Sequence, residues 1–240
     1  MILSTMTIYR EQDEGLLPAM IETLPKWSET CLIKTIPSGK GDYIIKNIKK
    51  KDNIVFAELH YKERWTGDFE FARARNKIRE VASGDWLLHL DSDDRLLIDQ
   101  HPLLSRTLES ADKNIYALLF NMLNYINAIK GDKIINELNK HLEIKCIRNN
   151  SKIRWESQRH ETVEFCLKRM NKIVLITPLM IHHIGYEVPI EKMIMKYKRN
   201  IEGFMHPEYS NCEQLKKEHY FNLLLRECIM YQKLMEVKNG

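Results

Sequence analysis

Apolar and polar residues in the first hundred positions alternate between the spacing of strands and the spacing of helices. Residues 2–9 and 54–61 are rich in β-branched and aromatic side chains, which favours strands. Residues 15–24 place apolar side chains on one helical face, and Pro25 ends that helix. Residues 86–90 form a short, nearly all-apolar run, typical of a strand covered on both faces. Alternation of this kind predicts an α/β fold with a largely parallel sheet.

The remaining elements follow from the same signals. A further strand is expected at residues 31–36, before the breaker-rich loop 37–41, and a helix at residues 69–82. Strands at 116–126, 141–148 and 172–181 would form a more antiparallel part of the sheet. Apolar spacing becomes helical from Ile190 onward, and a second helix is expected over 212–235. We therefore expect a catalytic domain over residues 1–188 and a helical C-terminal extension, residues 189–240, packed on it.

Composition narrows the class of protein. The chain has 240 residues, 44% hydrophobic and 29% charged, as in ordinary soluble globular proteins. The net charge of +4 is too small to indicate nucleic-acid binding. The densest charge run, Lys49 to Lys51, is interpreted as a solvated loop rather than a phosphate site.

Localisation signals point to the cytoplasm. The chain has five cysteines, an odd number, and no two of them are spaced as CxxC, so a disulfide framework is not expected. No basic leader precedes the first strand, and no apolar stretch approaches the roughly 18 residues of a membrane span.

The strongest chemical signal is Asp91-Ser92-Asp93-Asp94, directly after the apolar run 86–90. Ligands of open α/β sheets bind where strands end. Carboxylate oxygens are hard ligands suited to Mg²⁺ or Mn²⁺, and such an ion can neutralise a leaving diphosphate. The alternative interpretation is an acidic turn that caps a helix starting near Arg95.

Sequence blocks on both sides of this motif occur in a characteristic order. Trp65-Thr66-Gly67-Asp68-Phe69, Ala74-Arg75-Asn76 and Ala82-Ser83-Gly84-Asp85-Trp86 precede Leu90-Asp91-Ser92-Asp93. Trp155, His160-Glu161, His183-Ile184-Gly185-Tyr186 and Arg199-Asn200 follow it. This order resembles the family 2 glycosyltransferases. The resemblance implies a GT-A-like, Rossmann-type mixed sheet flanked by helices, and a DxD motif that binds a nucleotide-sugar through a metal.

The resemblance also implies roles for individual residues. Asp93 would be the more direct metal ligand, and Asp91 would contact the donor ribose or a metal-bound water. His183 would complete the metal shell or touch the diphosphate. Glu161 would be the general base of an inverting transfer, with Asp94 as the alternative. The other donor contacts that the resemblance implies are Thr5, Glu11, Asp42, Trp65, Arg75 and Asn76.

Each of these roles has a structural alternative. Arg75 could form a salt bridge that holds the Asp91 strand, His183 could be a packed histidine, and Trp65 could be part of the core. Glu161 could be a surface acid paired with Arg159 or Lys168. The N-terminal block departs from the family, because Tyr9-Arg10-Glu11 replaces its usual N-E pair and the aspartate expected after the second strand is absent. The base-binding end of the donor site therefore does not follow the family pattern, although uridine is the family default.

The predicted function is metal-dependent transfer of a sugar from a nucleotide-sugar, with UDP-sugar as the family default, to an acceptor hydroxyl with inversion. The acceptor is not specified by the sequence: a glycan, a lipid-linked sugar, a protein, a small metabolite and a modified nucleic-acid base are all alternatives. Formation of a homodimer through the C-terminal helices is a further alternative. One alternative is a degenerate binding module with the same fold. Another is an aspartyl-phosphate phosphatase, but Arg95 stands where that class has Thr or Val.

Overall fold

The computed structural model describes residues 2–38, 43–61, 71–130, 133–156, 162–186, 190–204 and 214–239. The chain separates into two compact units. The first unit contains Met1–Leu123 and Lys140–His183, and the second contains Asn124–Asn139 and Ile184–Gly240. The domain boundary expected at residue 188 stays a prediction.

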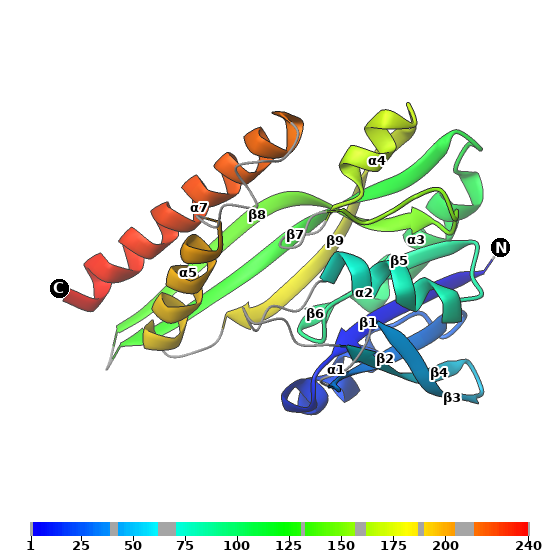
Figure 1. The fold of residues 1–240 in the computed structure, drawn as a ribbon, viewed down its shortest axis with the longest axis horizontal. Coiled ribbons are helices and arrows are strands. Elements are labelled where there is room, and N and C mark those ends of the chain that lie inside the picture. Colours follow the sequence, from blue (N-terminus) through cyan, green and yellow to red (C-terminus); the bar gives the residue numbers. More distant parts are fainter. Residues whose placement is uncertain are drawn as a thin grey trace. The chain divides into compact units, whose positions relative to one another are not determined.

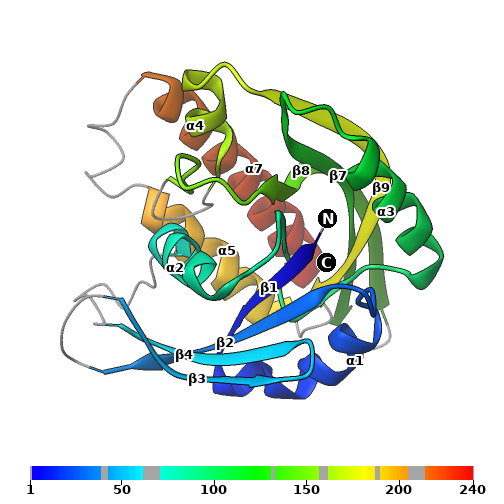
Figure 2. The ribbon, with the colours of Figure 1, turned by 90° about the vertical axis from the view of Figure 1, so that its right-hand side faces the viewer.

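Four parallel strands form the centre of the first unit. They are β1 (Leu3–Tyr9), β2 (Glu29–Pro37), β4 (Ile54–Tyr61) and β5 (Trp86–His89), in the order β4-β2-β1-β5. Their carboxyl ends therefore lie at one edge of the sheet, as the blue and cyan strands of Figure 2 show for β1, β2 and β4. All four residues of β5 are buried, as the apolar run predicted.

Antiparallel strands extend this sheet on both sides. The edge strand β3 (Ile44–Lys51) pairs with β4, and β8 (Lys133–Arg148) pairs with β5. Beyond β8 the order continues through β7 (Ile115–Lys130), β9 (Ile173–Tyr186) and the two-residue β6 (Asp94–Arg95). The sheet of the described residues thus has nine strands of mixed direction.

Helices cover both faces of the sheet in the first unit. On one face, α1 (Leu17–Glu22) and α3 (His101–Ser110) pack on a core that includes Trp86 and Leu88. On the other face, α2 (Phe71–Ile78) and α4 (Glu164–Arg169) pack on a core that includes Leu87. Successive residues of β5 alternate between the two cores because strand side chains point alternately to opposite faces. Short 3-10 helices lie at Glu11–Leu16, Arg79–Val81 and Ile98–Gln100.

In the second unit, two helices pack side by side (Figure 1). They are α5 (Ile190–Phe204) and α7 (Gln214–Asn239). Asn200 on α5 donates a hydrogen bond of 2.8 Å to the Glu227 carboxylate on α7. The buried apolar side chains between them are Met193, Ile194, Tyr197, Met230 and Leu234. Of the helices that the structure describes, none is both long and apolar enough to cross a membrane.

The predicted architecture, a mixed α/β sheet flanked by helices with helices at the C-terminus, is confirmed. Two local interpretations were wrong. Lys49 to Lys51 lie in the exposed strand β3 rather than in a loop, and lysines on an edge strand discourage pairing with another chain. Asp94 and Arg95 are extended in β6, so the acidic motif does not cap a helix starting at Arg95. Helices α3 and α4 were not predicted, because each is short and α3 buries only Leu104 and Leu108.

Candidate active site

The topology of the parallel strands marks one position as a binding site. From β1 the chain moves outward through β2 and β4, and it then returns to place β5 on the other side of β1. Such a reversal opens a crevice outside the carboxyl ends of the two strands that flank it. Leu90, just after β5, donates its backbone N–H to the Met6 carbonyl of β1 over 3.1 Å. The acidic motif therefore leaves the sheet at the reversal between β1 and β5.

Backbone hydrogen bonds hold the acidic motif in a tight turn. The Asp94 amide donates to the Asp91 carbonyl, and the Asp91 amide donates to Oδ2 of Asp94, both over 3.0 Å. The Arg95 guanidinium donates to the Ser92 carbonyl over 2.9 Å. These bonds fix the backbone of the turn and orient the Asp94 carboxylate.

Asp94 is the fully buried member of the turn, with no exposed surface. Its Oδ2 accepts a hydrogen bond of 3.2 Å from Lys145 Nζ on β8, besides the Asp91 amide. Its Oδ1 lies 2.8 Å from Nδ1 of His183. Asp94 is paired with His183 in the β6–β9 register, so the sheet itself brings this histidine to the motif from 89 residues away.

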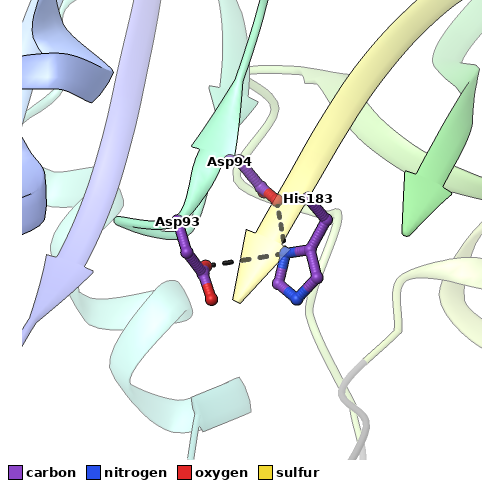
Figure 3. A group of neighbouring side chains, drawn as sticks. All are labelled: Asp93, Asp94 and His183. Carbon is purple, nitrogen blue, oxygen red and sulfur yellow. Dashed lines mark hydrogen bonds and ion pairs between the residues drawn. The ribbon is translucent and has the colours of Figure 1, made fainter. Parts of the chain in front are cut away.

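Asp93 lies beside the same histidine, with its Oδ1 at 3.6 Å from His183 Nδ1 (Figure 3). Burial raises the pKa of the Asp93 carboxyl, and repulsion from Asp91 and Asp94 raises it further, against the attraction of His183. Hydrogen bonding and ion pairing with Asp94 raise the pKa of His183 in spite of its burial. One potential ligand atom from each of Asp93, Asp94 and His183 lies within 4.8 Å of the others.

This group fits a divalent cation. Burial and its acidic neighbours disfavour the charged form of Asp93, and a nearby cation would relieve that cost. Carboxylate oxygens suit Mg²⁺ and Mn²⁺, and an imidazole nitrogen favours the transition metal of the two. The residues present therefore fit a divalent cation such as Mn²⁺ or Mg²⁺.

The nitrogen of His183 that faces a metal follows from its contact with Asp94. An ionised carboxylate only accepts hydrogen bonds, so Nδ1 carries the hydrogen in the contact with Asp94. Figure 3 shows Nε2 on the side of the ring that is turned away from Asp94. Nε2 is therefore the nitrogen that this arrangement assigns to coordination.

Asp91 is held differently from Asp93. Its Oδ1 lies 3.1 Å from Nη2 of Arg75, whose side chain is 4% exposed, whereas the Asp91 side chain is 44% exposed. Burial acts to raise the pKa of the Asp91 carboxyl, but Arg75, Lys145 and His183 outweigh it and the pKa is lowered. Asp91 is thus an ionised carboxylate that faces solvent from a fixed position, outside the Asp93–Asp94–His183 group.

The other residues considered as donor contacts lie in varied places. The Asn76 side-chain amide hydrogen-bonds the backbone of Trp155. It donates to the Trp155 carbonyl over 2.8 Å and accepts from the Trp155 N–H over 3.0 Å. Thr5 is fully buried in β1, and Glu11 is exposed at the start of the 3-10 turn after β1. Asp42, Trp65 and Glu161 lie outside the described residues.

Sequence reasoning missed Lys145, whose side chain is 3% exposed and contacts the acidic turn. A signal was present, because Lys145 interrupts an apolar strand segment between Ile144 and Cys146. A lysine in such a segment is expected to have a carboxylate partner, since a buried ammonium needs one.

Comparisons with known proteins give structural likenesses only. No protein-family profile and no curated protein matches the chain by sequence. The chain is similar to TarS from S. aureus, with 13% identity and a TM-score of 0.46 over 95% of this chain and 43% of that chain. It is similar to GalNAc-T7, solved with UDP, GalNAc and Mn²⁺, with 12% identity and a TM-score of 0.46 over 76% of this chain and 44% of that chain.

The bifunctional IspDF from Campylobacter jejuni is also similar, with 11% identity and a TM-score of 0.40 over 74% of this chain and 50% of that chain. TarS and GalNAc-T7 are glycosyltransferases. The chain spans half the length of these proteins or less. A shared fold does not by itself identify an activity or a substrate.

Proposed function

We propose that this protein is a divalent-metal-dependent glycosyltransferase of the family 2 type, which moves a sugar from a nucleotide-sugar to an acceptor hydroxyl. The observation that carries the proposal is the position of the acidic turn. Asp93, Asp94 and His183 gather where β5 ends, at the reversal of strand order where α/β sheets bind ligands. The ordered blocks from Trp65 to Asn200 support the same function independently of this geometry.

In this proposal each residue of the site has one task. Asp93 and Nε2 of His183 would hold Mn²⁺ or Mg²⁺, which when bound supplies charge stabilisation to the departing diphosphate. Asp91, fixed by Arg75, would face the donor ribose or a metal-bound water. Asp94 would orient His183 rather than act as a base, because its carboxylate is fully buried with both oxygens engaged.

The finer parts of the proposal come from the family resemblance. The donor would be a UDP-sugar, and Glu161 would remove the proton of the acceptor hydroxyl as it attacks the anomeric carbon, with inversion. Thr5, Glu11, Asp42, Trp65 and Asn76 would lie on the donor side of the site, with Asn76 acting through the Trp155 segment. The acceptor is a glycan, a lipid-linked sugar, a protein, a small metabolite or a modified nucleic-acid base.

The test is release of UDP from UDP-glucose and related donors with and without Mn²⁺. We expect slow hydrolysis that requires the metal, and Asp93→Asn should lower it by at least about 100-fold because the most direct ligand is lost. Asp52→Asn is the matched control, since Asp52 lies in an exposed turn at φ 52°, a conformation that asparagine tolerates.

Other outcomes would contradict the proposal. No donor turnover, together with no Mn²⁺-dependent rise in Tm in the presence of nucleotides, would favour a degenerate module. A phosphate mimic that forms an adduct on Asp91 would favour the phosphatase chemistry instead.

A further inference from the structure

Lys145 is a buried charge near the carboxyl end of β8. Its side chain is 3% exposed, and its neighbours Ile144, Cys146 and Ile147 are all buried. Moving an ammonium group out of water is costly unless partners compensate its charge. A lysine at this position therefore needs specific partners.

Its partners form a row of contacts that ends at the candidate metal site. Lys145 Nζ lies 3.2 Å from Oδ2 of Asp94 and 3.2 Å from Oε1 of Glu143. Glu143 in turn contacts Nε2 of His141 over 3.4 Å. On the other side of Lys145, Oδ1 of Asp94 lies 2.8 Å from Nδ1 of His183. These contacts therefore connect His141, Glu143, Lys145 and Asp94 to the imidazole ring of His183.

We infer that Lys145 is a positioning residue for metal binding, acting through Asp94 on His183. Lys145 and the Asp91 amide hold Oδ2 of Asp94, which directs Oδ1 at Nδ1 of His183. Nδ1 then keeps its hydrogen, and Nε2 is the coordinating nitrogen. In metal sites, a carboxylate behind a histidine fixes the tautomer and the ring orientation in this way.

Stability alone does not account for this pair. Buried ion pairs can often be replaced by apolar side chains of similar volume without loss of stability. Such a replacement would have to remove Lys145 and Asp94 together, because Asp94 is fully buried and Lys145 is its cationic partner. The use of a charge here is explained by what it orients, namely the carboxylate that meets His183.

The first test needs no metal and no variant. Long-range ¹H–¹⁵N correlation of the His183 ring in the metal-free protein, at a pH where its ¹⁵N shifts show a neutral ring, identifies the protonated nitrogen. We expect hydrogen on Nδ1. Hydrogen on Nε2 would overturn the inference, whatever the protein's activity.

The second test uses Lys145→Met, which keeps the length of the side chain and removes the charge. Free Mn²⁺ measured by electron paramagnetic resonance should show affinity weakened by about 10- to 100-fold, the usual effect of losing an outer partner of a ligand. Lys145→Arg should recover part of this affinity. The control Lys77→Met removes a surface lysine, 2.8 Å from Glu80, and should leave the affinity unchanged.

The result separates this inference from the proposed function, on which its metal-binding part rests. A folded Lys145→Met protein with wild-type Mn²⁺ affinity and an unchanged His183 tautomer would overturn the inference alone. Wild-type protein that binds no Mn²⁺ would refute the proposed function, and a comparison of the His183 tautomer in wild type and Lys145→Met would still decide the role of Lys145. If Lys145→Met does not fold, the tautomer of the wild type and the affinity of Lys145→Arg decide.

Discussion

Glu29 hydrogen-bonds residues at the amino ends of β1 and β5, two of the strands that lead to the candidate site. It is the first residue of β2 and is buried, and Oε2 accepts hydrogen bonds from the Ser4 hydroxyl at 2.6 Å and the Ser83 amide at 2.8 Å. Oε1 accepts from the Ser83 hydroxyl at 2.9 Å. Ser83 directly precedes the segment that enters β5, so one carboxylate joins β1, β2 and the start of β5.

We predict that Glu29→Gln lowers the free energy of unfolding by about 2 kcal/mol at pH 7. The glutamine oxygen can still accept the two bonds at Oε2, but each loses its charge assistance, worth about 1 kcal/mol. At Oε1 the Ser83 hydroxyl can rotate to accept from the new amide, so little more is lost. The contact with Lys50 at 3.5 Å adds little, because the lysine is mostly exposed.

The loss should depend on pH. Burial acts to raise the pKa of Glu29, but the hydrogen bonds from Ser4 and Ser83 and the attraction of Lys50 outweigh it and lower the pKa. The unfolded state then binds more protons than the folded state as the pH falls below the ordinary glutamate pKa. The stabilisation by the carboxylate is therefore complete above that pKa and is lost as the pH falls through the lowered, folded pKa.

Urea unfolding of both proteins between about pH 7 and pH 3 measures this dependence. The difference between wild type and Glu29→Gln should shrink as the pH falls. Glu80→Gln, in an exposed pair with Lys77, should change stability by less than about 0.5 kcal/mol at every pH. A Glu29→Gln difference that is constant over this range would refute the assignment of the stabilisation to the charged carboxylate.

Two further predictions concern the same framework. Gly84→Ala should lower the free energy of unfolding by about 2 kcal/mol or more, because a Cβ there would lie 2.5 Å from the Ser4 backbone nitrogen. In the same urea assay, the control Gly15→Ala should change it by less than about 0.5 kcal/mol, because its Cβ would meet nothing within 4 Å. Asn76→Ala should cost about 2 kcal/mol by losing both hydrogen bonds to the Trp155 backbone. Unchanged stability in Asn76→Ala would contradict the anchoring role.

The sequence by itself determined the features that depend on neighbouring residues. The apolar run 86–90 predicted a strand buried on both faces, and β5 is one, because burial on both faces requires consecutive apolar side chains. The alternating elements predicted the α/β class, and the acidic motif after a buried strand predicted where carboxylates would gather. Elements with weak local patterns escaped prediction, such as the lysine-rich strand β3, whose residues are almost all exposed.

Only the tertiary structure decided which acidic side chain has which partner. Asp91 faces Arg75, Asp94 faces Lys145 and His183, and Asp93 lies beside His183, although all three acids belong to one short turn. These pairings depend on the register between β6 and β9 and on the burial of residues 144–147 of β8. No periodicity in the sequence specifies a contact between residues 89 positions apart, because register is set by the packing of whole strands.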